Sequence, residues 1–186
     1  MENILTFDLE NWYDSEFIKE KSGQDFVLEG LNKVVSLLNK HKIKATFFVT
    51  GKILEKYPNE IKILSKQGHE IASHSHEHTM ISKLSAKKVR ENILRSRNLI
   101  RKVIGKSPYG FRAPSWSVSK KDFWVYAYLE KCGFSYSSSL FPMQMGLYGS
   151  FEFPVSAFRP LNDKKIIEIP STLFTVGLLR IPFSGG

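Results

Sequence analysis

The sequence predicts an α/β fold built on a mostly parallel sheet. Short apolar runs, typical of buried strands, alternate with longer stretches whose apolar residues recur at helical spacing. Four of the strand-like runs lead directly into segments with charged or polar side chains. Alternation of this kind is typical of βα units, in which successive strands lie parallel.

The first three elements are a strand, a helix and a strand. The apolar run Asn3–Phe7 predicts a buried strand, and Lys44–Val49 predicts a second strand rich in aromatic residues. Between them, Phe26–Lys40 is expected to be a helix that Asp25 can cap. Its expected inner face consists of Val27, Leu31, Val34, Val35 and Leu38.

Two short helical segments and a third strand follow. Lys52–Lys56 begins a helical turn, Pro58 restarts the helix, and Gly68 ends it. Glu70–Ser73 is predicted as a short strand that delivers the chain to His74.

The rest of the chain continues the alternation and then departs from it. The predicted helices are Ala86–Ile104 and Lys121–Lys131, and the predicted strands are Tyr109–Arg112, Phe134–Ser137 and Ile166–Ile169. The exception is Phe141–Asp163, which is rich in aromatic residues, Gly and Pro. Long loops in compact domains are often functional, so this segment is a candidate functional loop. The alternative is that it only covers the underside of the fold.

Length and composition fit one globular domain over residues 1–186. The net charge is +9, but much of the excess lies in the helix around residues 83–106, where it interleaves with apolar residues as on a solvated face. No nucleic-acid recognition motif accompanies the charge, so we expect no nucleic-acid partner.

The single Cys132 excludes an internal disulfide. Neither a secretory signal nor a membrane span is visible in this sequence, which favours a cytoplasmic location.

The segment HSHEH at residues 74–78 and the segment TFDLEN at residues 6–11 predict a metal site. On a helix, the i, i+4 spacing of His74 and His78 would put both imidazoles on one face. On a strand, Asp8 and Glu10 share a face at spacing i, i+2. Two imidazoles with one or two carboxylates suit a divalent cation. The alternative is a chance pair of surface histidines. We interpret His69 as structural, His41 as a solvated residue at the end of a helix, and His76 as the spare member of its cluster.

Four segments, in this order and spacing, give the chain its resemblance to a known family. They are TFDLEN at 6–11, ATFFVTG at 45–51, GHEIASHSHEH at 68–78 and FRAPSW at 111–116. From Ile4 to at least Pro142 the chain resembles the polysaccharide deacetylase family, which shares the NodB homology domain and is similar to carbohydrate esterase family 4. It resembles most the branch with an Asp-x-Glu first motif. The resemblance implies a distorted (β/α) barrel and a metal-dependent amide hydrolase that acts on N-acetylated sugars.

The resemblance also implies roles for individual residues. Asp8 matches the general base, and Arg112 matches the arginine that holds that base. His74 and His78 match the metal ligands. The family's usual metal-binding Asp is Leu9 here, so Glu10 is the expected substitute.

Further residues are expected to contact the substrate. Ser115 stands where the family often has Tyr, whose backbone N–H helps bind the oxyanion, and Trp116 and Trp12 are expected to line the sugar site. The expected cofactor is Zn²⁺, with Co, Ni, Mn or Fe as alternatives. Two departures remain. Ser137 replaces a family Asp, and no His follows His78 to protonate the leaving amine.

The leading hypothesis is a metal-dependent hydrolase that removes N-acetyl groups from a sugar in a polysaccharide or glycan precursor. The alternatives are an amidase acting on a small cyclic amide and an inactive glycan-binding relative. The apolar segment Phe174–Phe183 near the end of the sequence has no evident partner, and only six strands are visible. We therefore expect a barrel that is incomplete at its C-terminus, with little activity in the 186-residue form and homo-oligomers as a further expectation.

Overall fold

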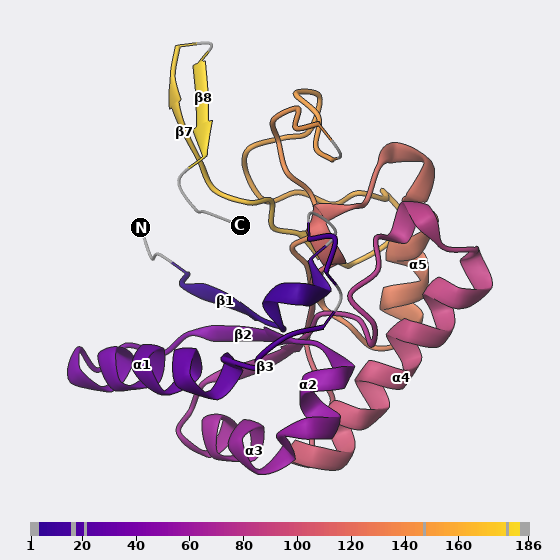
Figure 1. Ribbon diagram of the computed structural model, residues 1–186. Helices are drawn as coiled ribbons and strands as arrows, with labels where there is room; N and C mark the ends of the chain where they lie inside the picture. Colours follow the sequence, from indigo (N-terminus) through magenta and orange to yellow (C-terminus); the bar gives the residue numbers. More distant parts are fainter. Residues whose placement is uncertain (1–3, 16–17, 21, 147, 178, 183–186) are drawn as a thin grey trace. The chain divides into compact units, whose positions relative to one another are not determined.

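The computed structural model describes residues 4–15, 18–20, 22–146, 148–177 and 179–182. The chain forms two compact units, the first from residues 1–78 and 92–108 and the second from residues 79–91 and 109–186. Among the described residues, each unit contains three parallel strands. Figure 1 shows the path of the chain through its helices and strands. The alternation of helices and parallel strands agrees with the α/β fold that the sequence predicts.

The first unit pairs β1 (Thr6–Leu9) with β2 (Thr46–Val49), and β2 with β3 (Glu70–Ser73). The helices of this unit are α1 (Val27–Lys40), α2 (Gly51–Lys56), α3 (Pro58–Lys66) and the later part of α4 (Ala86–Ile104). Apolar side chains from these strands and helices form one buried core, which includes Phe47, Leu31, Ile53, Ile61 and Ile100. A short 3-10 helix, η1 (Trp12–Asp14), follows β1.

Local sequence explains how these helices begin and end. The Asp25 carboxylate accepts a hydrogen bond from the backbone N–H of Val27, 2.9 Å away, at the start of α1. The Thr50 hydroxyl caps α2, and Pro58 occupies the first turn of α3, where its missing N–H costs nothing. Gly68 follows α3 with a φ of +88°, a conformation that a residue with a side chain rarely adopts.

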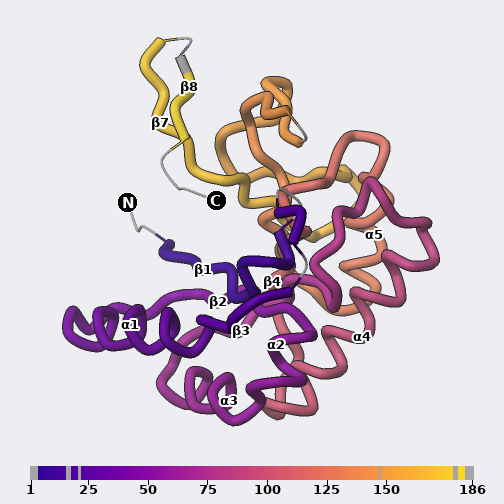
Figure 2. The backbone as a smooth tube through the Cα atoms, in the orientation of Figure 1, coloured from indigo at the N-terminus to yellow at the C-terminus, as the bar shows by residue number. Residues whose placement is uncertain are grey.

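The second unit pairs β4 (Gly110–Phe111) with β5 (Tyr136–Ser137), and β5 with β6 (Ile167–Glu168). The short 3-10 helices of this unit are η2 (Ile81–Lys83), η3 (Pro114–Trp116) and η4 (Lys120–Asp122), and its other helix is α5 (Trp124–Lys131). Between β5 and β6 the tube runs through the predicted aromatic loop without a helix or a named strand among its described residues (Figure 2).

Most of the described strands are shorter than the predicted ones or shifted from them, and one pair of strands was not predicted. The first strand covers Thr6–Leu9 rather than Asn3–Phe7, so Asp8 lies inside it, and Asn3 falls outside the described residues. The apolar segment near the end of the sequence forms an unpredicted antiparallel hairpin of β7 (Leu173–Val176) and β8 (Leu179–Pro182). The two strands pair with each other, but this pairing does not bury the segment, since Phe174, Val176 and Ile181 stay about half exposed. Phe183 lies outside the described residues.

Among the described residues, no helix has the length and apolar character needed to cross a bilayer. The interpretation of residues 1–186 as one catalytic domain stays a prediction.

Candidate functional site

Parallel pairing brings the candidate metal ligands to one edge of the first unit's sheet. The register places Leu9 beside Val49 and Val49 beside Ser73. The residues that follow β1 and β3, Glu10 and His74, therefore leave the sheet at the same edge. Active sites of α/β folds are built at this carboxyl edge.

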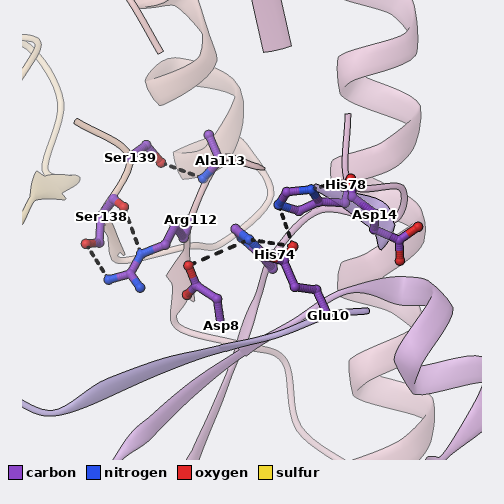
Figure 3. A network of polar contacts seen from close by, with 9 residues as sticks. All are labelled: Asp8, Glu10, Asp14, His74, His78, Arg112, Ala113, Ser138 and Ser139. Carbon is purple, nitrogen blue, oxygen red and sulfur yellow. Dashed lines mark hydrogen bonds and ion pairs between the residues drawn. The ribbon is translucent and has the colours of Figure 1, made fainter. Parts of the chain in front are cut away.

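Glu10, His74 and His78 converge there (Figure 3). One potential ligand atom from each residue lies within 4.8 Å of the others. The Glu10 Oε2 atom is 2.5 Å from His78 Nε2 and 3.8 Å from His74 Nε2. Asp8 Oδ2 is also 3.8 Å from His74 Nε2. Asp8 and Glu10 therefore point to the same side of the strand, as their spacing predicts.

Leu9 stands where the resemblance implies a metal-binding Asp, and the structure gives it a place in the core instead. Leu9 is buried and belongs to the apolar core of the first unit. Since side chains alternate along a strand, Leu9 points away from the side that carries Asp8 and Glu10. Glu10 is thus the carboxylate that meets the two imidazoles.

The segment that carries the histidines is a loop, not the helix on which their spacing would put both imidazoles on one face. Its backbone carbonyls are bound by another element: Gly51 N–H donates to Ser75 O at 3.0 Å, and Lys52 N–H donates to His76 O at 3.3 Å. Ser75 adopts a φ of +66°. The loop still brings the rings of His74 and His78 to a centroid separation of 5.0 Å.

His76 turns to a different neighbourhood from the other two histidines. A Cβ added at Gly51 would lie 1.9 Å from its Nδ1 atom, so the ring packs closely on the start of α2. Its Nε2 atom lies 3.8 Å from the Glu55 carboxylate. This placement agrees with the interpretation of His76 as the spare member of the histidine cluster.

The surroundings of His78 suit a metal ligand. Its Nδ1 atom lies 3.1 Å from the backbone carbonyl of Asp14, which can only accept a hydrogen bond. Nδ1 therefore carries a proton that points to this carbonyl, and Nε2 faces the Glu10 carboxylate at 2.5 Å. Histidine ligands of metals are commonly oriented by a backbone carbonyl in this way.

The electrostatic environment also favours a cation. Burial disfavours a charged His78, but the Glu10 carboxylate, the Asp14 carbonyl and the Asp8 charge outweigh it and raise the His78 pKa. Two imidazole nitrogens and one carboxylate oxygen match the ligand set of known catalytic zinc sites. The three residues therefore fit a divalent cation.

Trp12 lies near this group but is held by another contact. Its indole N–H donates to the Gln24 carbonyl at 2.9 Å. Together with Asp8 and Glu10, it lines a cavity of about 270 Å³ in the first unit, whose other walls are largely apolar.

In the second unit, Arg112 is buried and bound on two sides. Its Nε–H donates to the Ser138 carbonyl at 3.1 Å, and its Nη2 group donates to the Ser138 hydroxyl at 2.9 Å (Figure 3). The guanidinium carbon also lies 5.6 Å from the centre of the Trp116 ring. The direction of the Arg112 side chain is thus fixed from within the second unit.

Ser115 and Trp116 have unusual backbone conformations. Their φ angles are +52° and +45°, and such strain in residues other than Gly clusters at functional sites. Trp116 packs near Phe141 and Tyr148 of the aromatic loop, at ring separations of 5.7 and 6.0 Å. It lines a cavity of about 390 Å³ whose walls include several Ser and Lys side chains.

The sequence interpretation missed the support behind Arg112. Ser139 accepts a hydrogen bond from Ala113 N–H at 2.9 Å, and the fully buried Glu168 accepts hydrogen bonds from the backbone N–H groups of Ser139 and Leu140. The available signal was the charged residue inside the apolar strand IIEIP. Lys, Glu, Arg and Asp are almost never fully buried unless they are paired.

Comparison with known sequences gives one family match. The sequence model described as "Polysaccharide deacetylase" matches residues 4–136. A peptidoglycan-N-acetylglucosamine deacetylase from Bacillus cereus is 32% identical over 87 residues, which are 47% of this chain and 32% of that protein. A peptidoglycan deacetylase from Helicobacter pylori is 32% identical over 111 residues, which are 60% of this chain and 37% of that protein. The chain thus spans about a third of the length of these curated relatives.

Solved structures share the fold. One described as a polysaccharide deacetylase from Mycobacterium smegmatis has a TM-score of 0.66 and 22% identity, covering 98% of this chain and 64% of that one. An allantoinase has a TM-score of 0.62 and 20% identity, over 77% of this chain and 44% of its own. A Bacillus anthracis pseudoenzyme of the CE4 family has a TM-score of 0.56 and 21% identity, over 70% and 40%. These neighbours confirm the predicted fold class.

Proposed function

Because the chain belongs to the polysaccharide deacetylase family, we propose that it is a metal-dependent hydrolase that removes N-acetyl groups from a sugar. The observation that carries the proposal is the convergence of Glu10, His74 and His78 at the carboxyl edge of β1 and β3. The relatives named as peptidoglycan deacetylases support an N-acetylated glycan or its precursor as substrate. In this proposal, residues 1–186 act together as one catalytic domain.

The proposed metal ligands are Glu10, His74 and His78. A Zn²⁺ ion held there would polarise the amide carbonyl and acidify a water molecule, and Co, Ni, Mn or Fe are alternatives. The Asp14 carbonyl binds the Nδ1–H of His78 and leaves Nε2 as the nitrogen that would bind the metal.

The proposed general base is Asp8, whose carboxylate lies 3.8 Å from His74 Nε2. It removes a proton from the attacking water, whose oxygen bonds to the acetyl carbon. The C–N bond then breaks, the amine nitrogen gains a proton, and acetate and a free amino sugar are released. In the family's pattern, Arg112 keeps the base ionised and oriented.

The remaining roles concern the substrate. The backbone N–H of Ser115 is proposed to stabilise the negative oxygen that develops during attack. Trp12 and Trp116 each line a cavity, which supports a role for both in contacting the sugar. The group that protonates the leaving amine is not assigned, since no His follows His78 in the sequence.

Two alternatives each have an observation in their favour. The fold shared with an allantoinase favours an amidase acting on a small cyclic amide. A pseudoenzyme with this fold exists, which favours an inactive glycan-binding relative as the other alternative. The cytoplasmic location and the homo-oligomer remain predictions.

The test is release of acetate from a panel of N-acetylated oligosaccharides and from glycan precursors, with metal removed and with Zn²⁺ or Co²⁺ restored. It uses both the 186-residue chain and the complete reading frame that encodes it. Metal-dependent acetate release is the expected result. Hydrolysis of cyclic amides alone would favour the amidase, and glycan binding without acetate release by either form would favour the inactive relative.

A further inference from the structure

Glu168 is a charged residue in the core of the second unit. It belongs to β6 and is fully buried, with 0% of its surface exposed. Its Oε1 atom accepts hydrogen bonds from the backbone N–H groups of Ser139 and Leu140, at 2.7 and 2.8 Å. Its Oε2 atom accepts a hydrogen bond from the Tyr126 hydroxyl at 3.0 Å. A buried carboxylate is costly unless such donors satisfy it.

The surroundings of Glu168 affect its pKa and that of its neighbour Tyr126. Burial raises the Glu168 pKa, while hydrogen bonds from Ser137, Leu140, Ser139 and Tyr126 act against this rise. The pKa of Tyr126 is raised well above its ordinary value by burial and by the Glu168 charge, so its hydroxyl stays protonated and donates. Hydrogen bonds to an ionised acceptor are about twice as strong as those between neutral groups.

The same segment that Glu168 binds also binds Arg112. Ser138 accepts both hydrogen bonds from the Arg112 side chain, and the next residue, Ser139, accepts one from Ala113 N–H. The backbone N–H of Ser139 donates to Glu168. The segment after β5 is thus held by Glu168 through its amides while it holds Arg112 through its oxygens.

We propose that Glu168 is a positioning residue, which fixes the segment Ser138–Leu140 and thereby orients the Arg112 guanidinium. This inference rests on the proposed function, in which Arg112 orients the general base. Glu168 pairs in register with Ser137, where the family often carries an Asp. A carboxyl group therefore lies on the neighbouring strand, next to position 137, which itself carries no charge.

A purely structural role would give a different result. If Glu168 only stabilised the second unit, its substitution would lower the unfolding temperature and leave the folded protein's Arg112 contacts unchanged. If it orients Arg112, the Arg112 contacts must loosen in protein that is still folded.

Two conservative variants separate the effect of the Glu168 charge from the effect of its side-chain length. Glu168→Gln keeps the length and one acceptor oxygen but removes the charge, and Glu168→Asp keeps the charge but shortens the side chain by one methylene. The matched control is Glu130→Gln, because Glu130 also accepts a backbone hydrogen bond, from Lys165 N–H at 2.7 Å, but does not contact the Ser138–Leu140 segment.

The first readout is hydrogen exchange of the Arg112 Nε–H by NMR, with its signal assigned by loss in Arg112→Lys. We expect exchange about tenfold faster in both Glu168 variants, the factor that one lost hydrogen bond is worth, and no change in Glu130→Gln. This readout does not depend on activity, so it distinguishes failure of the inference from failure of the proposed function.

The second readout is acetate release. We expect kcat to fall by about 10–100-fold in the Glu168 variants, as for other residues that orient catalytic groups, with KM and bound metal unchanged. Unchanged Arg112 exchange in folded Glu168 variants would overturn the proposal. If neither variant folds, Tyr126→Phe replaces them, since it removes the hydroxyl that binds Oε2 and Ser137 but keeps the Glu168 carboxyl group. Arg112 exchange no faster than in Glu130→Gln would then overturn the proposal.

Discussion

Glu10 is the residue on which the proposed metal site differs most from the family's pattern. It lies 2.5 Å from His78 Nε2, while the preceding Leu9 is part of the core. The alternation of side chains along β1 explains why the ligand moves by one position. This substitution could be predicted from sequence because it needs only the strand's periodicity of two.

We predict that Glu10→Ala weakens metal binding by more than about 100-fold, since the groups that merely orient a metal ligand are worth 10–100-fold. Isothermal titration with Zn²⁺ measures the affinity. Glu29→Gln is the control, because Glu29 is exposed and pairs only with Lys33 among the described contacts. Equal affinities in Glu10→Ala and the wild type would remove Glu10 from the ligand set.

Substitution of Asp8 should lower the rate of acetate release without lowering the amount of bound metal. Asp8→Asn keeps the shape of the side chain but cannot accept the proton of water, so we predict bound metal near the wild-type level and a rate about 10²–10⁴-fold lower. Metal analysis and acetate release on the same preparation check both parts. Asp163→Asn, an exposed substitution, is the control. Acetate release at the wild-type rate would place the base elsewhere.

At the scale of elements, the start of α2 holds the loop that carries the histidines. Two backbone N–H groups of α2, from Gly51 and Lys52, donate to carbonyls of that loop, and Gly51 leaves room for the His76 ring. The spacing of the histidines alone could not reveal this loop. The i, i+4 pattern fits a helix equally well, and the bonds that decide the conformation join residues more than twenty positions apart.

We predict that Gly51→Ala weakens metal binding although Gly51 is no ligand. The added Cβ would lie 1.9 Å from His76 Nδ1, so the loop must shift and move His74 and His78. Gly30→Ala in α1 is the matched control. It meets no atom within 4 Å and should stabilise the protein by about 0.4–1 kcal/mol. Zinc titration and thermal unfolding of both variants provide the measurement. Wild-type affinity in Gly51→Ala would show that α2 does not position the loop.

The hairpin of β7 and β8 is an element that the sequence analysis did not predict. An apolar run without a polar turn motif gives no clear sign of antiparallel pairing. The register instead pairs Phe174 with Ile181. The hairpin also leaves Phe174, Val176 and Ile181 about half exposed.

At the scale of the whole molecule, the exposed apolar residues of the hairpin lead to a prediction about association. Phe174 and Val176 lie on one face of β7, and Ile181 is the cross-strand partner of Phe174. Exposed apolar patches favour self-association. We predict that the double variant Phe174→Thr, Val176→Thr, which keeps β-branched residues suited to a strand, shifts the protein toward monomer in sedimentation velocity. An unchanged distribution would exclude the hairpin as the contact.

Much of the fold follows from sequence because strands and helices have different hydrophobic periods. The third strand and the fourth helix have their predicted bounds, Glu70–Ser73 and Ala86–Ile104. The candidate metal ligands could be predicted because parallel strands place their carboxyl ends at one edge. Glu168 could not, because its partners are backbone amides of a distant loop that no periodicity reveals.

The account's central claim is that Glu10, His74 and His78 hold one catalytic metal ion. The most direct measurement is a Zn²⁺ binding isotherm for metal-free wild-type protein and for His74→Ala and His78→Ala, all without a His tag. The account predicts one tightly bound ion per chain in the wild type and binding more than about 100-fold weaker in each variant. Tight binding of one ion with unchanged affinity in both variants would contradict it.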